Sequence, residues 1–215
     1  NIDACRAENP NVTWKELHER CGECPWPQPT GWQSPFCPNN LHRTMMQRVA
    51  PYTLRGFLYY QGEEDVVRYE GYSDMMIALV KQWRMDWNDW SLPFLFVQLP
   101  MYVAIDTEDD KKWAMQREQQ AIAAAMLKRV GMISMTDCGE FDNIHPLDKE
   151  TPGTRLALLA EQMVYGTGEE WTPTVQQMYS DGTALYLVFD HVADGLVIHA
   201  SQPETCQIAG ADGVY

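Results

Sequence analysis

Apolar runs typical of buried strands alternate with helical periodicities through the middle of the chain. The runs that predict strands are residues 54–60, 93–99 and 131–136. Residues 71–87 and 151–164, whose apolar residues recur with helical spacing, predict helices, and so do residues 113–126, which are rich in Ala, Gln and Met. Strands joined through helices favour a parallel sheet with helices on its faces. The sequence therefore predicts an α/β fold with a three-layer α/β/α arrangement.

Two polar stretches follow strand-like runs, where parallel α/β sheets bind ligands. Gln61, Gly62 and Glu63 come directly after the first run, and Asp142 and His145 lie in the segment after the third run. In open α/β sheets, ligand sites lie beyond the carboxyl ends of the strands. Both stretches fall on the same edge of the predicted sheet, and we expect them to meet in space.

The second stretch has the composition of a general base. The Asp142 carboxylate can accept a hydrogen bond from the Nδ1–H of His145, which leaves Nε2 free to take a proton from a nucleophile. Pro146 biases His145 toward an extended backbone. The competing interpretation of this motif is a solvated loop that precedes a helix.

The first stretch can supply hydrogen-bond donors. The Gln61 carboxamide and the amides around Gly62 can donate to an oxyanion, and glycine lets a ligand approach the backbone closely. Glu63 is interpreted as a residue that holds the turn, with a second catalytic carboxylate as the alternative. Oxyanion donors together with an Asp–His pair are the catalytic groups of acyl transfer, which also requires a nucleophile.

The charge of the chain bears on its partners. The 215 residues carry a formal net charge of −14, so no basic stripe is available for nucleic acid or for an anionic membrane surface. No apolar run approaches the roughly 20 residues that span a bilayer. We therefore expect neither nucleic acid nor membrane as a partner. The sequence leaves the oligomeric state open.

Four of the six cysteines lie near the amino terminus: Cys5, Cys21, Cys24 and Cys37. A cysteine-dense loop rich in proline and tryptophan predicts disulfides and a secreted, lysosomal or otherwise extracytoplasmic protein. A zinc site that adds His18 to these cysteines is one alternative, although its spacing matches no standard site. Free thiols are the other alternative.

The segments differ enough in character to predict three regions. Residues 1–37 form an irregular cysteine- and proline-rich region, residues 38–166 form part of an α/β domain, and residues 173–215 begin a β-rich domain. Asp181-Gly182 between two β-like runs predicts a hairpin. Because the first residue is Asn1 rather than Met and the last ones continue a β-like region, both ends are expected to be cuts in a longer protein.

Several blocks, in the same order, resemble the sialate O-acetylesterases, which are carbohydrate esterases of the SGNH hydrolase superfamily. The similar segments are residues 54–63, 72–84 and 93–99, Trp113 with residues 117–120, and residues 142–157. The resemblance implies a serine esterase that removes O-acetyl groups from sugars. It also implies that His145 is the base, Asp142 its partner and Gln61 an oxyanion donor. It adds no metal or organic cofactor.

The chain departs from this family at the nucleophile. The family places its serine in a Gly-Gln-Ser-Asn block on the first strand, and this sequence has no such block. Ser34 follows a glutamine, but Pro35 comes next and no strand-like run precedes it. We therefore expect this chain to be inactive alone. The alternative is a non-catalytic, carbohydrate-binding relative on the same scaffold. The identity of the acetylated sugar stays open.

Overall fold

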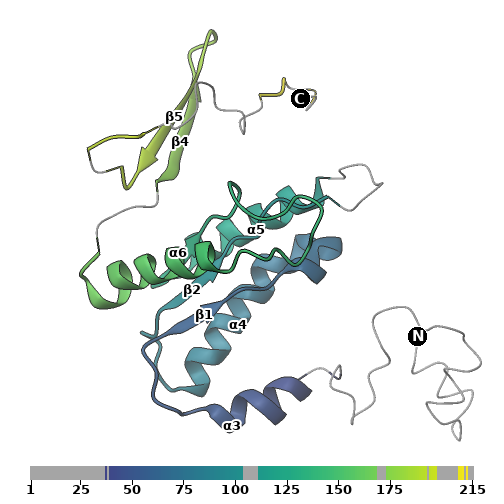
Figure 1. The fold of residues 1–215 in the computed structure, drawn as a ribbon, viewed down its shortest axis with the longest axis vertical. Helices are drawn as coiled ribbons and strands as arrows, with labels where there is room; N and C mark the ends of the chain where they lie inside the picture. The colour runs from purple at the N-terminus through teal and green to yellow at the C-terminus, as the bar shows by residue number, and fades with distance from the viewer. Residues whose placement is uncertain are drawn as a thin grey trace, which may run out of the picture. The chain divides into compact units, whose positions relative to one another are not determined.

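The computed structural model describes residues 37, 39–103, 111–168, 173–192, 194–197, 208–210 and 212. The chain divides into two compact units, Asn1–Arg55 with Asp74–Leu92, and Gly56–Ser73 with Pro93–Tyr215. Figure 1 follows the elements along the chain. They are η1 (His42–Met46), α3 (Gln47–Val49), β1 (Phe57–Tyr59), η2 (Glu63–Gly71), α4 (Tyr72–Asp86), β2 (Phe94–Val97), α5 (Lys112–Met126), β3 (Val130–Ile133), α6 (Glu150–Ala160), η3 (Glu161–Tyr165), β4 (Thr174–Ser180) and β5 (Leu185–Asp190).

Three strands of the second unit form a parallel sheet in the order β1-β2-β3. Phe57 pairs with Phe94, and Phe94 pairs with Val130, so the strands run side by side in register. The predicted α/β class and the alternation of strands with helices are confirmed. Because all three strands point the same way, the loops that follow them leave from one edge of the sheet.

One face of the sheet packs against α6. The buried cluster there consists of Leu95, Val97 and Ile133 from the sheet, Met135 just after β3, and Leu156 and Leu159 from α6. Gly131 lets the helix approach closely, because a Cβ atom there would lie 2.9 Å from Leu159 Cδ2. Burying one leucine-sized side chain stabilises a fold by about 2 kcal/mol, so this cluster is a main source of stability.

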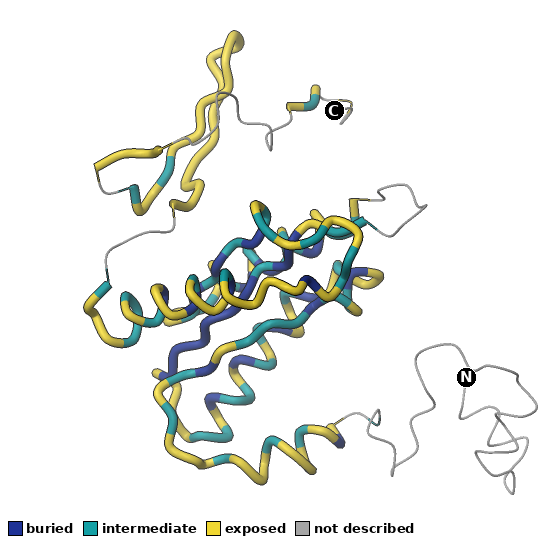
Figure 2. Tube along the Cα trace, viewed as in Figure 1, coloured by how far each residue is buried: buried dark blue, intermediate teal, exposed yellow. Residues whose placement is uncertain are grey.

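The opposite face of the sheet is buried as well. Phe94 and Phe96 are fully buried, and the Phe94 ring lies 5.9 Å from the Phe57 ring and 5.5 Å from the Tyr59 ring. Figure 2 shows the buried path through β2. Burial on both faces of β2 is what the predicted three-layer arrangement requires.

The first unit holds a histidine–carboxylate pair. His42 Nε2 lies 2.6 Å from Asp86 Oδ2, and both side chains are largely buried. Gln82 Nε2 donates a second hydrogen bond to Asp86 at 2.9 Å. Arg84 is buried and donates from Nε to the Leu92 carbonyl at 2.9 Å.

The predicted hairpin at Asp181-Gly182 is confirmed. Strands β4 and β5 pair antiparallel, and nearly all of their residues are exposed, as the yellow colour of this hairpin in Figure 2 shows. Asp181 accepts hydrogen bonds from the backbone N–H groups of Thr183 and Ala184, and these bonds lower the pKa of the Asp181 carboxyl. Gly182 takes the positive φ of +91° that the turn needs.

The structure shifts some predicted boundaries. Residues 54–56 precede β1 rather than belonging to it, and the predicted turn after Gln61 continues as the 3-10 helix η2. No helix within the described residues is long and apolar enough to cross a membrane. The boundaries of the three predicted regions, 1–37, 38–166 and 173–215, stay predictions.

Candidate functional site

The turn after β1 fixes the Gln61 side chain on both sides. Gln61 Oε1 accepts a hydrogen bond from the Tyr59 hydroxyl at 2.8 Å, and Nε2 donates to Asp65 Oδ2 at 3.0 Å. A carboxamide nitrogen carries two hydrogens. Asp65 takes one of them, which leaves the second as the side-chain donor that a bound oxyanion could use.

Gly62 has a conformation and surroundings that only glycine tolerates well. Its φ is +143°, and a Cβ atom would lie 3.0 Å from the Tyr72 hydroxyl and 3.2 Å from Gln116 Nε2. The prediction that this glycine lets a ligand approach the backbone closely stays a prediction. The close approach in the structure is between the turn and two of the protein's own side chains.

Tyr72 and Gln116 bind the backbone of this turn and were missed by the sequence reasoning. The Tyr72 hydroxyl donates to the Gln61 carbonyl at 3.0 Å, and Gln116 Nε2 donates to the Gly62 carbonyl at 3.2 Å. Burial raises the pKa of the Tyr72 hydroxyl, so it stays protonated and keeps its donor. Helical spacing marked Tyr72 as a core residue, and no sequence signal marked Gln116.

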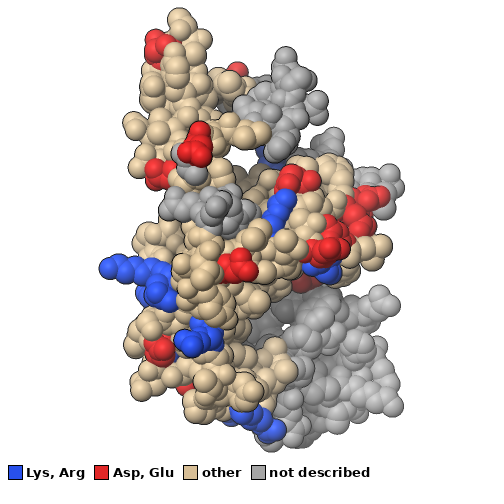
Figure 3. Space-filling model, turned by 60° about the vertical axis from the view of Figure 1, so that its left-hand side comes forward, with Lys and Arg blue, Asp and Glu red and all other residues tan. Residues whose placement is uncertain are grey.

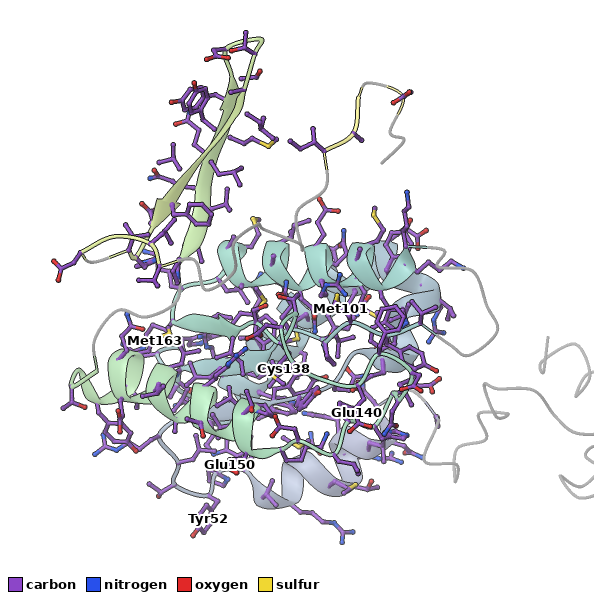
Figure 4. The ribbon with its side chains drawn as sticks, turned by 45° about the horizontal axis from the view of Figure 1, so that its top comes forward. Tyr52, Met101, Cys138, Glu140, Glu150 and Met163 are labelled. Carbon is purple, nitrogen blue, oxygen red and sulfur yellow. The ribbon has the colours of Figure 1, made fainter. Side chains whose placement is uncertain are left out.

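The loop between β3 and α6 is braced by Glu140, which Figure 4 labels. Glu140 Oε2 accepts a hydrogen bond from Asn143 Nδ2 at 2.7 Å, and Oε1 accepts from the Leu147 backbone N–H at 2.6 Å. These bonds lower the pKa of the Glu140 carboxyl. One carboxylate thus ties together the chain on both sides of His145. Glu140 was not predicted from the sequence, although an acidic residue beside a turn-forming Asn is a detectable signal.

Asp142 and His145 lie on this braced loop, and both are exposed. The His145 backbone N–H donates to Asn143 Oδ1 at 2.9 Å. Within the described part of the chain, no hydrogen bond joins the Asp142 carboxylate to the His145 imidazole. Asn143 therefore holds the backbone at His145, and the predicted pairing with Asp142 stays a prediction.

Residues next to the Gln61 turn contact residues next to the loop that carries His145. Lys149 Nζ lies 5.1 Å from the centroid of the Tyr60 ring, and Tyr60 directly precedes Gln61 in the sequence. Tyr60 and Cys138 pack against the same buried cluster. Strands β1 and β3 flank β2, and neighbouring strands lie about 4.8 Å apart. The turn after β1 and the loop after β3 thus leave the same edge of one sheet, while the roles of their side chains stay predictions.

An ion pair ties the start of the second loop to α6. Arg155 makes a bidentate contact with Asp137, at 2.7 Å from Nη1 and 2.6 Å from Nη2. The hydrogen bonds from Arg155 lower the pKa of the Asp137 carboxyl to about 2. Nη1 also donates to the Ser134 carbonyl, so α6 and the loop that follows β3 are fastened to each other.

This ion pair predicts a dependence of stability on pH. Because the pKa of Asp137 is lowered on folding, to about 2, the pair stabilises the protein above the ordinary pKa and loses its effect as the pH falls toward 2. The Asp137 side chain is 63% exposed, so solvent limits its contribution to about 0.5 kcal/mol. Urea unfolding from pH 6 to pH 2 should show that Asp137→Asn costs this amount at pH 6 and nothing at pH 2. A constant difference across this range would contradict the assignment.

Acidic side chains dominate the charge of the chain, and Figure 3 shows groups of them on one face. Within the described ranges, no cluster of three His, Cys, Asp or Glu side chains could hold a metal ion. Cys37 and Cys138 are free thiols. The structure therefore gives no support for a disulfide at Cys37. The predicted disulfides or zinc ligands at Cys5, Cys21, Cys24 and His18 lie outside the described residues.

The class of protein follows from the fold and a solved structure. A carbohydrate acetylesterase from Xanthomonas citri matches with a TM-score of 0.61 and 34% sequence identity, over 66% of this chain and 34% of that chain. The chain has the α/β fold of a carbohydrate esterase. Residues 28–164 match the family described as carbohydrate esterase, sialic acid-specific acetylesterase, and the chain belongs to that family.

Curated relatives agree with this assignment. Sialate O-acetylesterase from Rattus norvegicus is 28% identical over 142 residues, which cover 59% of this chain and 26% of the relative. Sialate O-acetylesterase from Homo sapiens is 27% identical over 161 residues, which cover 67% of this chain and 30% of the relative. The family predicted from the sequence blocks is confirmed. The chain spans less than a third of the length of these relatives.

Proposed function

We propose that this chain is the base-bearing part of a serine carboxylic-ester hydrolase that removes acetyl groups from O-acetylated carbohydrates such as sialate. The observation that carries the proposal is the placement of the Gln61 turn and the His145 loop at one edge of the parallel sheet, inside the segment that matches the esterase family. Acyl transfer requires oxyanion donors and a base that face one reaction centre.

In the proposed mechanism, His145 Nε2 takes the proton of a serine hydroxyl as that oxygen attacks the acetyl carbonyl carbon. The carbonyl oxygen becomes an anion, which the second amide hydrogen of Gln61 stabilises. Collapse of the intermediate breaks the bond to the sugar oxygen, which takes the proton from His145. Water activated by His145 then hydrolyses the acetyl-serine and releases acetate. Asp142 orients the imidazole, and Glu63 holds the turn.

We infer that residues 1–215 do not supply the nucleophilic serine. The sequence has no Gly-Gln-Ser-Asn block, and its relatives are more than three times as long as the matched segment. We assign the serine to the remainder of the full-length protein, so that residues 1–215 alone are inactive. An extracytoplasmic location, which suits acetylated glycans as substrates, also stays a prediction.

The test is acetate release by the full-length protein. We expect hydrolysis of 4-nitrophenyl acetate and of an O-acetylated carbohydrate, with O-acetylated sialate and acetylated xylan assayed side by side to identify the sugar. We also expect residues 1–215 alone to release no acetate. A full-length protein that binds these sugars without hydrolysing any ester would overturn the proposal in favour of a carbohydrate-binding relative.

A further inference from the structure

Two buried polar side chains hold successive carbonyl groups of the turn after β1. The Tyr72 hydroxyl binds the Gln61 carbonyl at 3.0 Å, and Gln116 Nε2 binds the Gly62 carbonyl at 3.2 Å. Tyr72 is 3% exposed and Gln116 is fully buried, so both carbonyls point toward the interior. The Asp65 backbone N–H adds a third bond, to the Gly62 carbonyl at 3.1 Å.

Because the peptide bond is planar, the direction of these two carbonyl groups also fixes the direction of the N–H groups that follow them. In a trans peptide, the C=O of one residue and the N–H of the next point in opposite directions. With the Gln61 and Gly62 carbonyls held inward, the N–H groups of Gly62 and Glu63 are directed away from Tyr72 and Gln116. Glu63 is the first residue of η2, so its N–H has no acceptor within that helix.

The Oε1 atom of Gln116 indicates that this side chain does not serve to stabilise the fold. Among the described residues, none donates a hydrogen bond to Gln116 Oε1, although this oxygen is fully buried. A buried acceptor without a partner destabilises the folded state, and an apolar side chain of the same length would avoid that loss. Residues that break such a rule concentrate at functional sites.

We propose that Tyr72 and Gln116 are positioning residues that aim the backbone N–H groups of Gly62 and Glu63 at the oxyanion of the acetyl-transfer step. The inference rests on the proposed esterase function and extends its set of oxyanion donors beyond the Gln61 side chain. The two side chains touch neither substrate nor nucleophile. They act through the peptide groups that they hold.

The test compares Tyr72→Phe and Gln116→Met with Ser73→Ala in the full-length protein. Ser73 is the matched control, because its hydroxyl joins the same two helices by donating to Gln119 Oε1 at 2.7 Å rather than to a carbonyl of the turn. We expect kcat for 4-nitrophenyl acetate to fall about tenfold in Tyr72→Phe and in Gln116→Met, with KM within about twofold, because a misaligned donor weakens transition-state binding. Ser73→Ala should keep the kcat of the wild type.

Two further measurements separate positioning from a structural role. The Tm of Gln116→Met should be equal to or higher than that of the wild type, so that activity and stability change in opposite directions. Inhibition by an alkyl boronic acid, whose adduct with the nucleophile carries a tetrahedral anion, should weaken by the same factor as kcat.

The outcomes that overturn the inference are distinct from those that overturn the proposed function. An active wild type whose kcat is unchanged in both variants, or falls equally in Ser73→Ala, removes the inference and leaves the esterase function standing. A wild-type protein without esterase activity removes both.

Discussion

Replacing His145 with alanine in the full-length protein is expected to lower kcat/KM for 4-nitrophenyl acetate by about 10³-fold, the effect of losing a general base. The reason is that His145 is the only imidazole on the described loop between β3 and α6. Glu140 is occupied by Asn143 and the Leu147 backbone. The loss should appear in kcat, because the imidazole acts in the transition state.

The folded state of this variant should remain intact. His145 is exposed, and the hydrogen bond that fixes its position comes from its backbone N–H to Asn143 Oδ1 at 2.9 Å, which alanine retains. Surface substitutions of this kind change the free energy of unfolding by less than about 0.5 kcal/mol. Equal Tm values for the variant and the wild type would therefore show that the lost activity is chemical in origin.

His42→Ala is the informative control, because His42 forms the one His–carboxylate hydrogen bond that the described residues contain. This pair has the geometry of a catalytic dyad, with Nε2 2.6 Å from Asp86 Oδ2. In our proposal it is structural, and its removal should lower Tm while kcat stays near that of the wild type. The opposite pattern, with activity lost at position 42 and retained at position 145, would make His42 the base and end the assignment of His145.

The order of the helices and strands could be predicted from the sequence, because the spacing of apolar residues and the length of apolar runs are local properties. Apolar runs predicted all three parallel strands, and the Asp181-Gly182 pair predicted the hairpin. The parallel arrangement followed from the connections, and with it the shared edge for Gln61 and His145. The 3-10 helix η2 was missed, because a short acidic segment with no clear period reads as a turn.

The support around the site was not predictable in the same way. Gln116 donates to the Gly62 carbonyl, and every residue type has a backbone carbonyl, so the sequence could not identify this partner. Glu140 was missed for the same reason, because it accepts from the backbone N–H of Leu147. The prediction paired His145 with Asp142, whereas Asn143 binds the His145 backbone. Residue types in the sequence indicated the candidate chemistry. Only the fold revealed which neighbouring residues hold the Gln61 turn and the His145 loop in place.

Gln120→Leu is expected to destabilise the protein by about 3 kcal/mol, in contrast to Gln116→Met one helical turn earlier. Gln120 is fully buried, and both ends of its carboxamide are used. Its Oε1 accepts from the Leu99 backbone N–H at 2.9 Å, and its Nε2 donates to the Val97 carbonyl at 3.4 Å. Leucine fills the same space but leaves two buried backbone groups at the end of β2 without partners.

Urea unfolding measures this difference directly. The midpoint should fall in Gln120→Leu while the dependence of the unfolding free energy on urea stays the same, because the surface buried on folding does not change. The same measurement on Gln116→Met should give no loss, since that position already carries an acceptor without a partner. If the two variants lose equal stability, the two glutamines do the same structural work. In that case the unsatisfied oxygen of Gln116 no longer distinguishes it from Gln120, and Gln116 is a structural residue rather than a positioning residue.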